Sequence, residues 1–288
     1  MDKKKKKLKK FFRDNLNNKN RAGYGRPKNK GVHNETPYIH ADNTFKTYLS
    51  QCYHFADWCY ERGIKYPEEA YGKVPEYGKW MEDRGLSAWT VYTAICAIAK
   101  GYGVTTKDLG YKVPKRERQN IKRSRNAAER DKHFSEKNNK ELIIFGNCTG
   151  LRRSELEKLR GNQLAVDDNG KLFLFHIKGK GGKIRNVDLI GSAEEITVIK
   201  KTMAQAGEGL VFPKVHSAYD EHYHRSLYAC RAYRSKARDV ETLDTKDKYI
   251  CRKDKAGTVY DRQALLYISR QLGHNRADVV VNSYLYNL

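Results

Sequence analysis

The chain has 288 residues, a length that suits one large domain or, more commonly, two ordinary ones. Its 57 Lys and Arg residues against 34 Asp and Glu residues give a formal net charge of +23. An excess of this size attracts polyanions and favours nucleic acid as a partner, although a soluble or ribosome-associated basic protein can carry the same charge. No apolar run reaches the roughly 20 residues that a membrane span requires. The six cysteines form no C-x-x-C pair and no histidine group at metal-ligand spacing. We therefore expect a cytoplasmic protein with reduced cysteines, no membrane contact, no metal and no cofactor.

The first 35 residues are dominated by Lys, Arg, Asn and Gly, with the runs KKKKKLKK and GYGRPKNKG. Their few apolar residues predict a flexible basic arm over residues 1–35. The interpretation that we favour is an electrostatic grip on DNA. A merely solvated tail and a nuclear-import-like signal remain alternatives.

Three helices are expected next, because aromatic and apolar residues recur at helical spacing. They span Thr44 to Glu61, Pro75 to Asp83, and a stretch that Ser87 can cap and that ends near Tyr102. Such stripes are more typical of a core than of a binding surface, so residues 36–116 are predicted to form a helical domain. The highly charged stretch that follows predicts an interdomain linker over residues 117–129.

The second half of the chain contains both helix-like and strand-like patterns of apolar residues. A helix that Ser135 can cap is followed by a break at Gly150 and a short helix from Ser154 to Leu159. Two strand-like runs, Lys171 to Ile177 and Ile184 to Leu189, are joined by KGKGGK. Further helices are expected over 193–205, 222–237 and 262–272, with a charged hairpin over 241–261 that turns at 255–257. Residues 130–288 are therefore predicted to form a mainly α domain with a small antiparallel β-sheet.

Four segments of this half carry residues suited to chemistry: TGLRRSEL at 149–156, KGKGGKIRNV at 178–187, HYHRSLYA at 222–229, and LGHNR with NSYL between 272 and 285. In this order, behind a helical domain, they resemble the motifs of the tyrosine recombinase (phage integrase) family. The resemblance implies a helical core-binding domain (36–116) and an α+β catalytic domain (130–288). Together these would close on duplex DNA as a C-shaped clamp.

Carried over residue by residue, the resemblance implies a catalytic set of Arg152, Lys180, His222, Arg225, His274 and Tyr284, with the tyrosine as nucleophile. The sequence leaves neighbouring candidates open at three of these positions: Arg153 for the first arginine, Lys178 or Lys183 for the lysine, and Tyr286 for the nucleophile.

The chemistry explains why such residue types are needed. A phosphodiester attacked by a hydroxyl gathers negative charge on its non-bridging oxygens, which the fixed donors of Arg152 and Arg225 suit. The leaving 5′ oxygen needs a proton, which an ammonium such as that of Lys180 can supply. Tyrosine has an ordinary pKa of about 10, so Tyr284 needs a nearby acceptor or a cationic field. His222 and His274 are the available helpers.

We therefore expect a site-specific recombinase that cleaves and rejoins DNA through a 3′-phosphotyrosine, without ATP or metal, to integrate or excise a mobile element. Its expected partners are double-stranded DNA, further copies of itself in a homo-tetramer on paired sites, and accessory DNA-bending proteins. One alternative is an enzyme like type IB topoisomerases, which relaxes DNA as a monomer. Another is a catalytically silent DNA-binding accessory or regulator with the same fold, which would form no covalent adduct.

Overall fold

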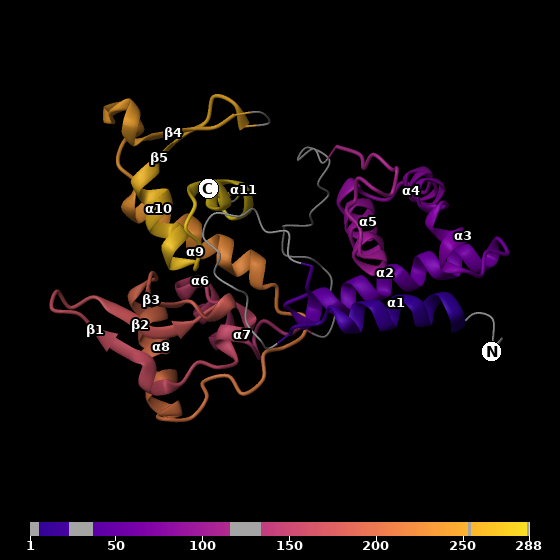
Figure 1. Ribbon diagram of the computed structural model, residues 1–288. Coiled ribbons are helices and arrows are strands. Elements are labelled where there is room, and N and C mark those ends of the chain that lie inside the picture. Colours follow the sequence, from indigo (N-terminus) through magenta and orange to yellow (C-terminus); the bar gives the residue numbers. More distant parts are fainter. Residues whose placement is uncertain (1–5, 23–36, 116–133, 253–254, 287) are drawn as a thin grey trace. The chain divides into compact units, whose positions relative to one another are not determined.

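The computed structural model of the protein describes residues 6–22, 37–115, 134–252, 255–286 and 288 (Figure 1). The chain divides into two compact units, residues 1–122 and 123–288, and each unit has its own apolar core. The structure is mainly helical with small antiparallel sheets, which confirms the expected fold class. The predicted linker, residues 117–129, lies outside the described residues. In the part of the chain that the structure describes, no helix is long and apolar enough to cross a membrane.

The first unit is built from helices α1 (Lys6–Asn18), α2 (Asp42–Glu61), α3 (Pro67–Tyr71), α4 (Val74–Asp83) and α5 (Ala88–Tyr102). The three predicted helices are confirmed as α2, α4 and α5. As expected, Ser87 caps α5, since its hydroxyl accepts a hydrogen bond from the backbone N–H of Thr90 at 3.2 Å. Gly103 ends the same helix in the left-handed conformation (φ 79°) that glycine adopts without strain.

Helix α1 differs from the expected flexible arm. Its residues Leu8, Phe12 and Leu16 are fully buried, and α1 packs against α2 and α5. The three side chains recur every four residues, which aligns them on one helical face and leaves the lysines between them on the other faces. This apolar stripe is hidden in the sequence by the lysines that surround it. Residues 1–5 and 23–35 of the predicted arm are not among those described.

The second unit begins with α6 (Lys140–Thr149) and the single turn α7 (Arg153–Leu156), followed by a sheet of β1 (Leu164–Val166), β2 (Leu172–Lys178) and β3 (Ile184–Asp188). The strands are antiparallel in the order β1-β2-β3. Helices α8 (Ala193–Ala206) and α9 (Glu221–Lys236), the hairpin β4 (Lys248–Ile250) and β5 (Val259–Asp261), and helices α10 (Arg262–Gln271) and α11 (Ala277–Ser283) complete it. Short 3₁₀ turns lie at Gly161–Gln163, Lys180–Gly182, Val240–Thr242 and Thr245–Asp247.

These elements follow the predicted ones, with the following main differences. The helix expected to start after Ser135 begins only at Lys140, the helix expected up to Leu159 ends at Leu156, and β1 and α11 were not predicted. The charged hairpin expected over 241–261 is found as β4 and β5, but it begins only at Lys248, and the residues before it include two 3₁₀ turns.

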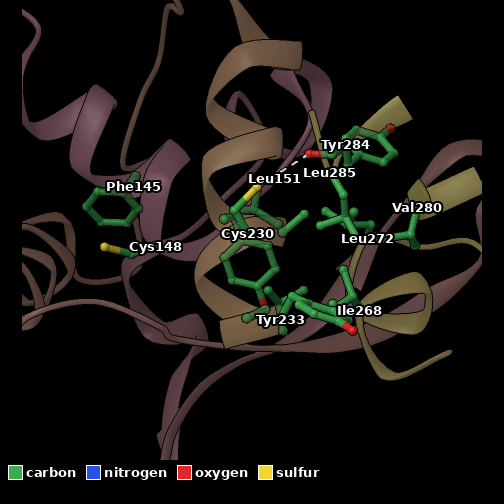
Figure 2. Close-up of a cluster of buried hydrophobic side chains, with 14 of the residues drawn as sticks. Phe145, Cys148, Leu151, Cys230, Tyr233, Ile268, Leu272, Val280, Tyr284 and Leu285 are labelled. Carbon is green, nitrogen blue, oxygen red and sulfur yellow. Dashed lines mark hydrogen bonds between the residues drawn. The ribbon is translucent and has the colours of Figure 1, made fainter. Parts of the chain in front are cut away.

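Helix α9 lies at the centre of the second unit, packed against α6 and α10, while α10 also packs against α11. Figure 2 shows part of the resulting core, in which Leu151, Cys230, Leu272 and Val280 gather from four different segments. This packing brings together the loop after α6, the buried face of α9, the turn after α10 and the end of α11. The predicted chemical residues lie on these same segments.

Candidate active site

Arg225 is the innermost of the predicted site residues. It projects from α9, and its side chain is fully buried. One terminal nitrogen donates to the carbonyl of Gly150, and the other donates to the carbonyl of Leu272 at 3.0 Å and to the hydroxyl of Tyr284 at 3.3 Å. Burial lowers the pKa of the guanidinium, while the nearby tyrosine acts to raise it. A guanidinium stays charged in proteins, so Arg225 places a positive charge directly beside the phenol.

Arg152 comes from the turn that leads from α6 into α7. Gly150 makes this turn with a φ of 59°, and a side chain there would collide with the ring of Tyr228. One terminal nitrogen of Arg152 donates to the carbonyl of Leu272 at 3.1 Å, the same carbonyl that Arg225 contacts, and lies 3.4 Å from Nε2 of His274. The Arg152 side chain is 18% exposed, so its guanidinium can be reached from solvent while its partners fix it from behind.

Glu155, which the sequence analysis did not single out, holds Arg152 in place. Its carboxylate is 1% exposed and accepts from Arg152 Nη1 at 3.0 Å, from the Arg152 backbone at 2.8 Å, and from Arg185 at 2.8 and 2.9 Å. Burial acts to raise the pKa of the Glu155 carboxyl, but the hydrogen bonds from Arg185 and Arg152 outweigh it and bring the pKa below its usual value. The sequence did contain one sign of this role, because Glu155 follows Arg152 by three residues. At this spacing a carboxylate in the first turn of a helix can accept a hydrogen bond from the backbone N–H of the residue that precedes the helix.

His274 stands between Arg152 and the tyrosine. It follows Gly273, whose φ is 77°, and its Nε2 lies 3.4 Å from Arg152 Nη2 and 3.4 Å from the Tyr284 hydroxyl. Because an arginine nitrogen can only donate, Nε2 must be the accepting nitrogen and the ring proton must sit on Nδ1. Burial lowers the pKa of His274 to about 4, and the neighbouring arginines Arg152 and Arg225 add to this effect. The imidazole is therefore neutral at pH 7 and can accept a proton.

Tyr284 follows α11 directly, and the residue is 4% exposed. Its backbone N–H donates to Val280 at 2.9 Å, and its carbonyl accepts from the thiol of Cys230 at 3.7 Å, the contact that Figure 2 draws as a dashed line. The ring of His222, which is exposed, stacks at a tilt of 23° with its centroid 6.4 Å from that of Tyr284. The alternative nucleophile, Tyr286, instead donates its hydroxyl to the carbonyl of His222 at 3.3 Å.

The alternative first arginine, Arg153, turns away from this group. Its two terminal nitrogens donate to the backbone carbonyls of Val215, His216, Ser217 and Tyr219 at 2.6 to 3.0 Å. Arg153 therefore fastens the loop before α9, and Arg152 is the arginine that reaches His274.

The predicted lysine is not brought to the other residues. Lys180 is exposed in the 3₁₀ turn between β2 and β3, and no contact described for it reaches the rest of the set. Lys183, three residues further, instead donates to the side chain of Asn275 at 2.6 Å and to the carbonyl of His274 at 3.5 Å. The hairpin that carries Lys180 is thus fastened beside the site through Lys183.

The charge balance of the site is positive. Arg152 and Arg185 pair with one carboxylate, that of Glu155, and Arg225 adds a third positive charge nearby, so the arrangement suits an anion with several oxygens such as a phosphodiester. Among the described residues, no group of three or more His, Cys, Asp or Glu side chains could hold a metal ion. The hydroxyl of Tyr284, two guanidinium groups and a neutral imidazole are the groups available for chemistry.

The sequence matches no protein-family model and no curated protein. Among solved structures the chain is similar to the Tn1549 transposon integrase in complex with circular intermediate DNA, with a TM-score of 0.49, 12% identity, and coverage of 98% of this chain and 96% of that chain. A variant of that integrase with transposon right end DNA gives a TM-score of 0.47 at 12% identity, and a second variant with circular intermediate DNA gives 0.46 at 11%, each with the same coverage. Similarity at this level of identity does not transfer a function to this chain.

Proposed function

We propose that the chain is a site-specific DNA recombinase that cleaves and rejoins strands through a 3′-phosphotyrosine at Tyr284. The observation that carries the proposal is the convergence of Arg152, Arg225 and His274 on this tyrosine, two of them in direct reach of its hydroxyl. These residues come from four segments separated by up to 132 positions, from 152 to 284. A phenol hydroxyl within reach of the Arg225 guanidinium and of the neutral imidazole of His274, with Arg152 beside that imidazole, fits the attack on a phosphodiester.

In the proposed reaction, Arg152 and Arg225 bind the non-bridging oxygens of the scissile phosphate. The oxygen of Tyr284 attacks phosphorus and passes its proton to Nε2 of His274, which is neutral and within reach. The bond from phosphorus to the 5′ oxygen breaks, and Lys180 gives that oxygen a proton from the flexible end of its side chain. His222 packs against the ring of the nucleophile and orients it.

The bond formed between tyrosine and phosphorus retains the free energy of the bond that breaks. Attack by a 5′ hydroxyl on the phosphotyrosine therefore rejoins a strand without ATP, and the proton movements run in reverse. When the incoming hydroxyl belongs to a second duplex, the same two steps exchange strands. The formal charge of +23 supports double-stranded DNA as the substrate. We propose that the two units close around the duplex as a clamp, and that four protomers act on paired sites of a mobile element.

A covalent trapping experiment tests the proposal. Duplexes that bind the protein are first selected from a random-sequence pool, and each is remade with a nick at successive positions so that the cleaved 5′-hydroxyl fragment diffuses away. The protein is incubated with these duplexes in EDTA without ATP and run on a denaturing gel. A protein-DNA band is expected for the wild type and for Tyr286→Phe, and no band for Tyr284→Phe.

Tyr284 and Tyr286 lie in the same tryptic peptide, which starts at Ala277. Fragmentation of this peptide in the mass spectrometer then shows which of the two tyrosines is modified. A band that persists in Tyr284→Phe would refute the assignment of the nucleophile. Binding without a band at any nick position would favour a silent DNA-binding accessory protein. Relaxation of supercoiled plasmids of any sequence by the monomer would favour the topoisomerase-like alternative.

A further inference from the structure

The β4–β5 hairpin is firmly fixed at its base. Asp261, at the end of β5, is fully buried and accepts hydrogen bonds from the Arg238 side chain at 2.8 and 2.9 Å. It also caps α10 by accepting from the backbone of Gln263 at 2.9 Å, while its own N–H donates to the hydroxyl of Tyr233 at 2.9 Å. The side-chain hydrogen bond from Arg238 is the main reason that the pKa of Asp261 lies well below its usual range, so the carboxylate stays charged. The base of the hairpin is therefore tied to α9 and α10.

The far end of the hairpin reaches the helix that precedes the nucleophile. Lys255 donates from its ammonium to the carbonyl of Val281 in α11 at 2.9 Å. The backbone of Lys255 is itself held in the hairpin, because its carbonyl accepts from Thr258 at 3.1 Å and the carbonyl of Thr258 accepts from Cys251 at 2.9 Å. Figure 1 shows α11 close to this end of the hairpin.

The contacted carbonyl lies at a sensitive point of the chain. α11 has only seven residues, and the last four carbonyls of a helix lack partners in a following turn. The carbonyl of Val280 accepts from the backbone of Tyr284 at 2.9 Å and of Leu285 at 3.2 Å. The next carbonyl, that of Val281, accepts from Lys255, and a cation at a helix C-terminus also interacts favourably with the helix dipole. The last turn before Tyr284 is thus held partly by the chain itself and partly by the hairpin.

We propose that Lys255 is a positioning residue for the nucleophile: by binding the Val281 carbonyl it fixes the end of α11, so that the Tyr284 hydroxyl stays between Arg225 and His274. This inference rests on the proposed function, since it assigns a task to a residue that touches neither the phosphate nor the reacting atoms. A small displacement of a reacting group, of about 1 Å, can cost on the order of a hundredfold in rate. The hairpin therefore controls the cleavage step without entering it.

The test compares Lys255→Met, which keeps the length of the side chain but removes its donor and charge, with Lys255→Arg and with Lys246→Met. Lys246 is a matched control, because it lies in the 3₁₀ turn directly before β4 and its side chain is 79% exposed. Adduct formation is measured at saturating DNA, and the dissociation constant for the same duplex is measured separately. Lys255→Met is expected to slow the reaction about tenfold with less than a twofold change in affinity, Lys255→Arg to restore most of the rate, and Lys246→Met to react as the wild type.

An unchanged rate for Lys255→Met would overturn the proposal, and so would weaker DNA binding with an unchanged rate at saturation, which would mark a phosphate contact. Hydrogen exchange of the DNA-free protein provides a second readout that does not depend on activity. The amides of Tyr284 and Leu285 are expected to exchange faster in Lys255→Met and at the wild-type rate in Lys246→Met. If they do so while the wild type forms no adduct, the proposed function has failed and the anchoring of α11 stands; unchanged exchange means that the anchoring has failed.

Discussion

Replacement of Glu155 by glutamine tests the electrostatic basis of the site. The carboxylate accepts hydrogen bonds from the side chain and backbone of Arg152 and from both terminal nitrogens of Arg185. Glutamine has nearly the same shape but replaces one oxygen by an NH₂ group, which can only donate. If the remaining oxygen keeps facing Nη1 of Arg152 and of Arg185, the NH₂ group faces the backbone N–H of Arg152 and Nη2 of Arg185. Two buried donors then lose their acceptor.

The expected loss of stability can be bounded in two ways. A buried donor without an acceptor costs about 1–3 kcal/mol, so two donors cost about 2–6 kcal/mol. Removal of one partner from a buried ion pair costs about 3–5 kcal/mol. We expect Glu155→Gln to lower the free energy of unfolding of the second unit by about 3–5 kcal/mol, a large part of the roughly 5–15 kcal/mol of a typical domain.

The pH dependence of this difference has a definite sign. The folded-state pKa of Glu155 lies below its usual value, so its stabilisation is present above the unfolded-state pKa of about 4.3 and is lost as the pH falls through the lower folded pKa. The difference in free energy of unfolding between the wild type and Glu155→Gln is therefore constant from pH 6 to 8 and becomes smaller only below about pH 4.

The assay can separate the two units, because the three tryptophans, Trp58, Trp80 and Trp89, all belong to the first. Far-ultraviolet circular dichroism reports both units, whereas tryptophan fluorescence reports only the first. In guanidinium titrations of Glu155→Gln, the part of the circular dichroism change that comes from the second unit should occur at a lower guanidinium concentration, while the midpoint of the fluorescence transition stays unchanged. Glu157→Gln, two residues away and without a described ion pair, should change stability by less than about 0.5 kcal/mol. A loss below about 1 kcal/mol in Glu155→Gln would refute the reasoning.

Three further predictions follow from other parts of the structure. Phe12→Ala should lower the free energy of unfolding reported by tryptophan fluorescence by about 3–5 kcal/mol, since it leaves a cavity at a fully buried position. An unchanged free energy of unfolding would instead support the interpretation of this segment as a flexible arm. Arg153→Met should lower the stability of the second unit by about 1–3 kcal/mol and leave the rate of adduct formation per folded molecule within twofold, whereas a loss of rate like that of Arg152→Met would assign it to the reaction. The rate should be level from pH 6 to 8 and fall only as the pH approaches 4, because burial lowers the pKa of His274 to about 4 and the base is neutral above it; a fall centred near pH 6.5 would exclude this role.

The sequence predicted those elements that have a long pattern of apolar residues and whose ends carry capping residues or glycines. Helix α5 combines a cap at Ser87, an apolar stripe and a glycine at its end, and each of these signals is local. Helix α1 was missed because lysines surround Leu8, Phe12 and Leu16. The composition of this segment indicated an unfolded arm, although the recurrence of these apolar residues every four positions indicated a helix. Helix α11 was missed because seven residues carry too little periodicity to be read.

The site divides in a similar way. Arg152, Arg225, His274 and Tyr284 could be named from motifs, yet only the fold shows that they meet, and that Arg153 and Tyr286 face other partners. The roles of Lys183, Glu155 and Lys255 could not be read from the sequence, because each depends on a partner that is distant along the chain or on a carbonyl that has no sequence signature.

The carbonyl of Leu272 shows why such partners matter for the chemistry. In the proposed reaction two guanidinium groups share one phosphate, and they repel each other before the phosphate arrives. The Glu155 carboxylate offsets part of this repulsion on the side of Arg152. Here both Arg152 and Arg225 donate to the carbonyl of Leu272, the residue that caps the C-terminal end of α10. The end of a helix carries only a fraction of a negative charge, so it holds two cations at one point and neutralises them less than a second carboxylate would. The turn from Leu272 through Gly273 also carries His274, so the same few atoms fix the position of this imidazole relative to both arginines. Under the proposed function, a change in this turn should therefore alter DNA binding and proton transfer together.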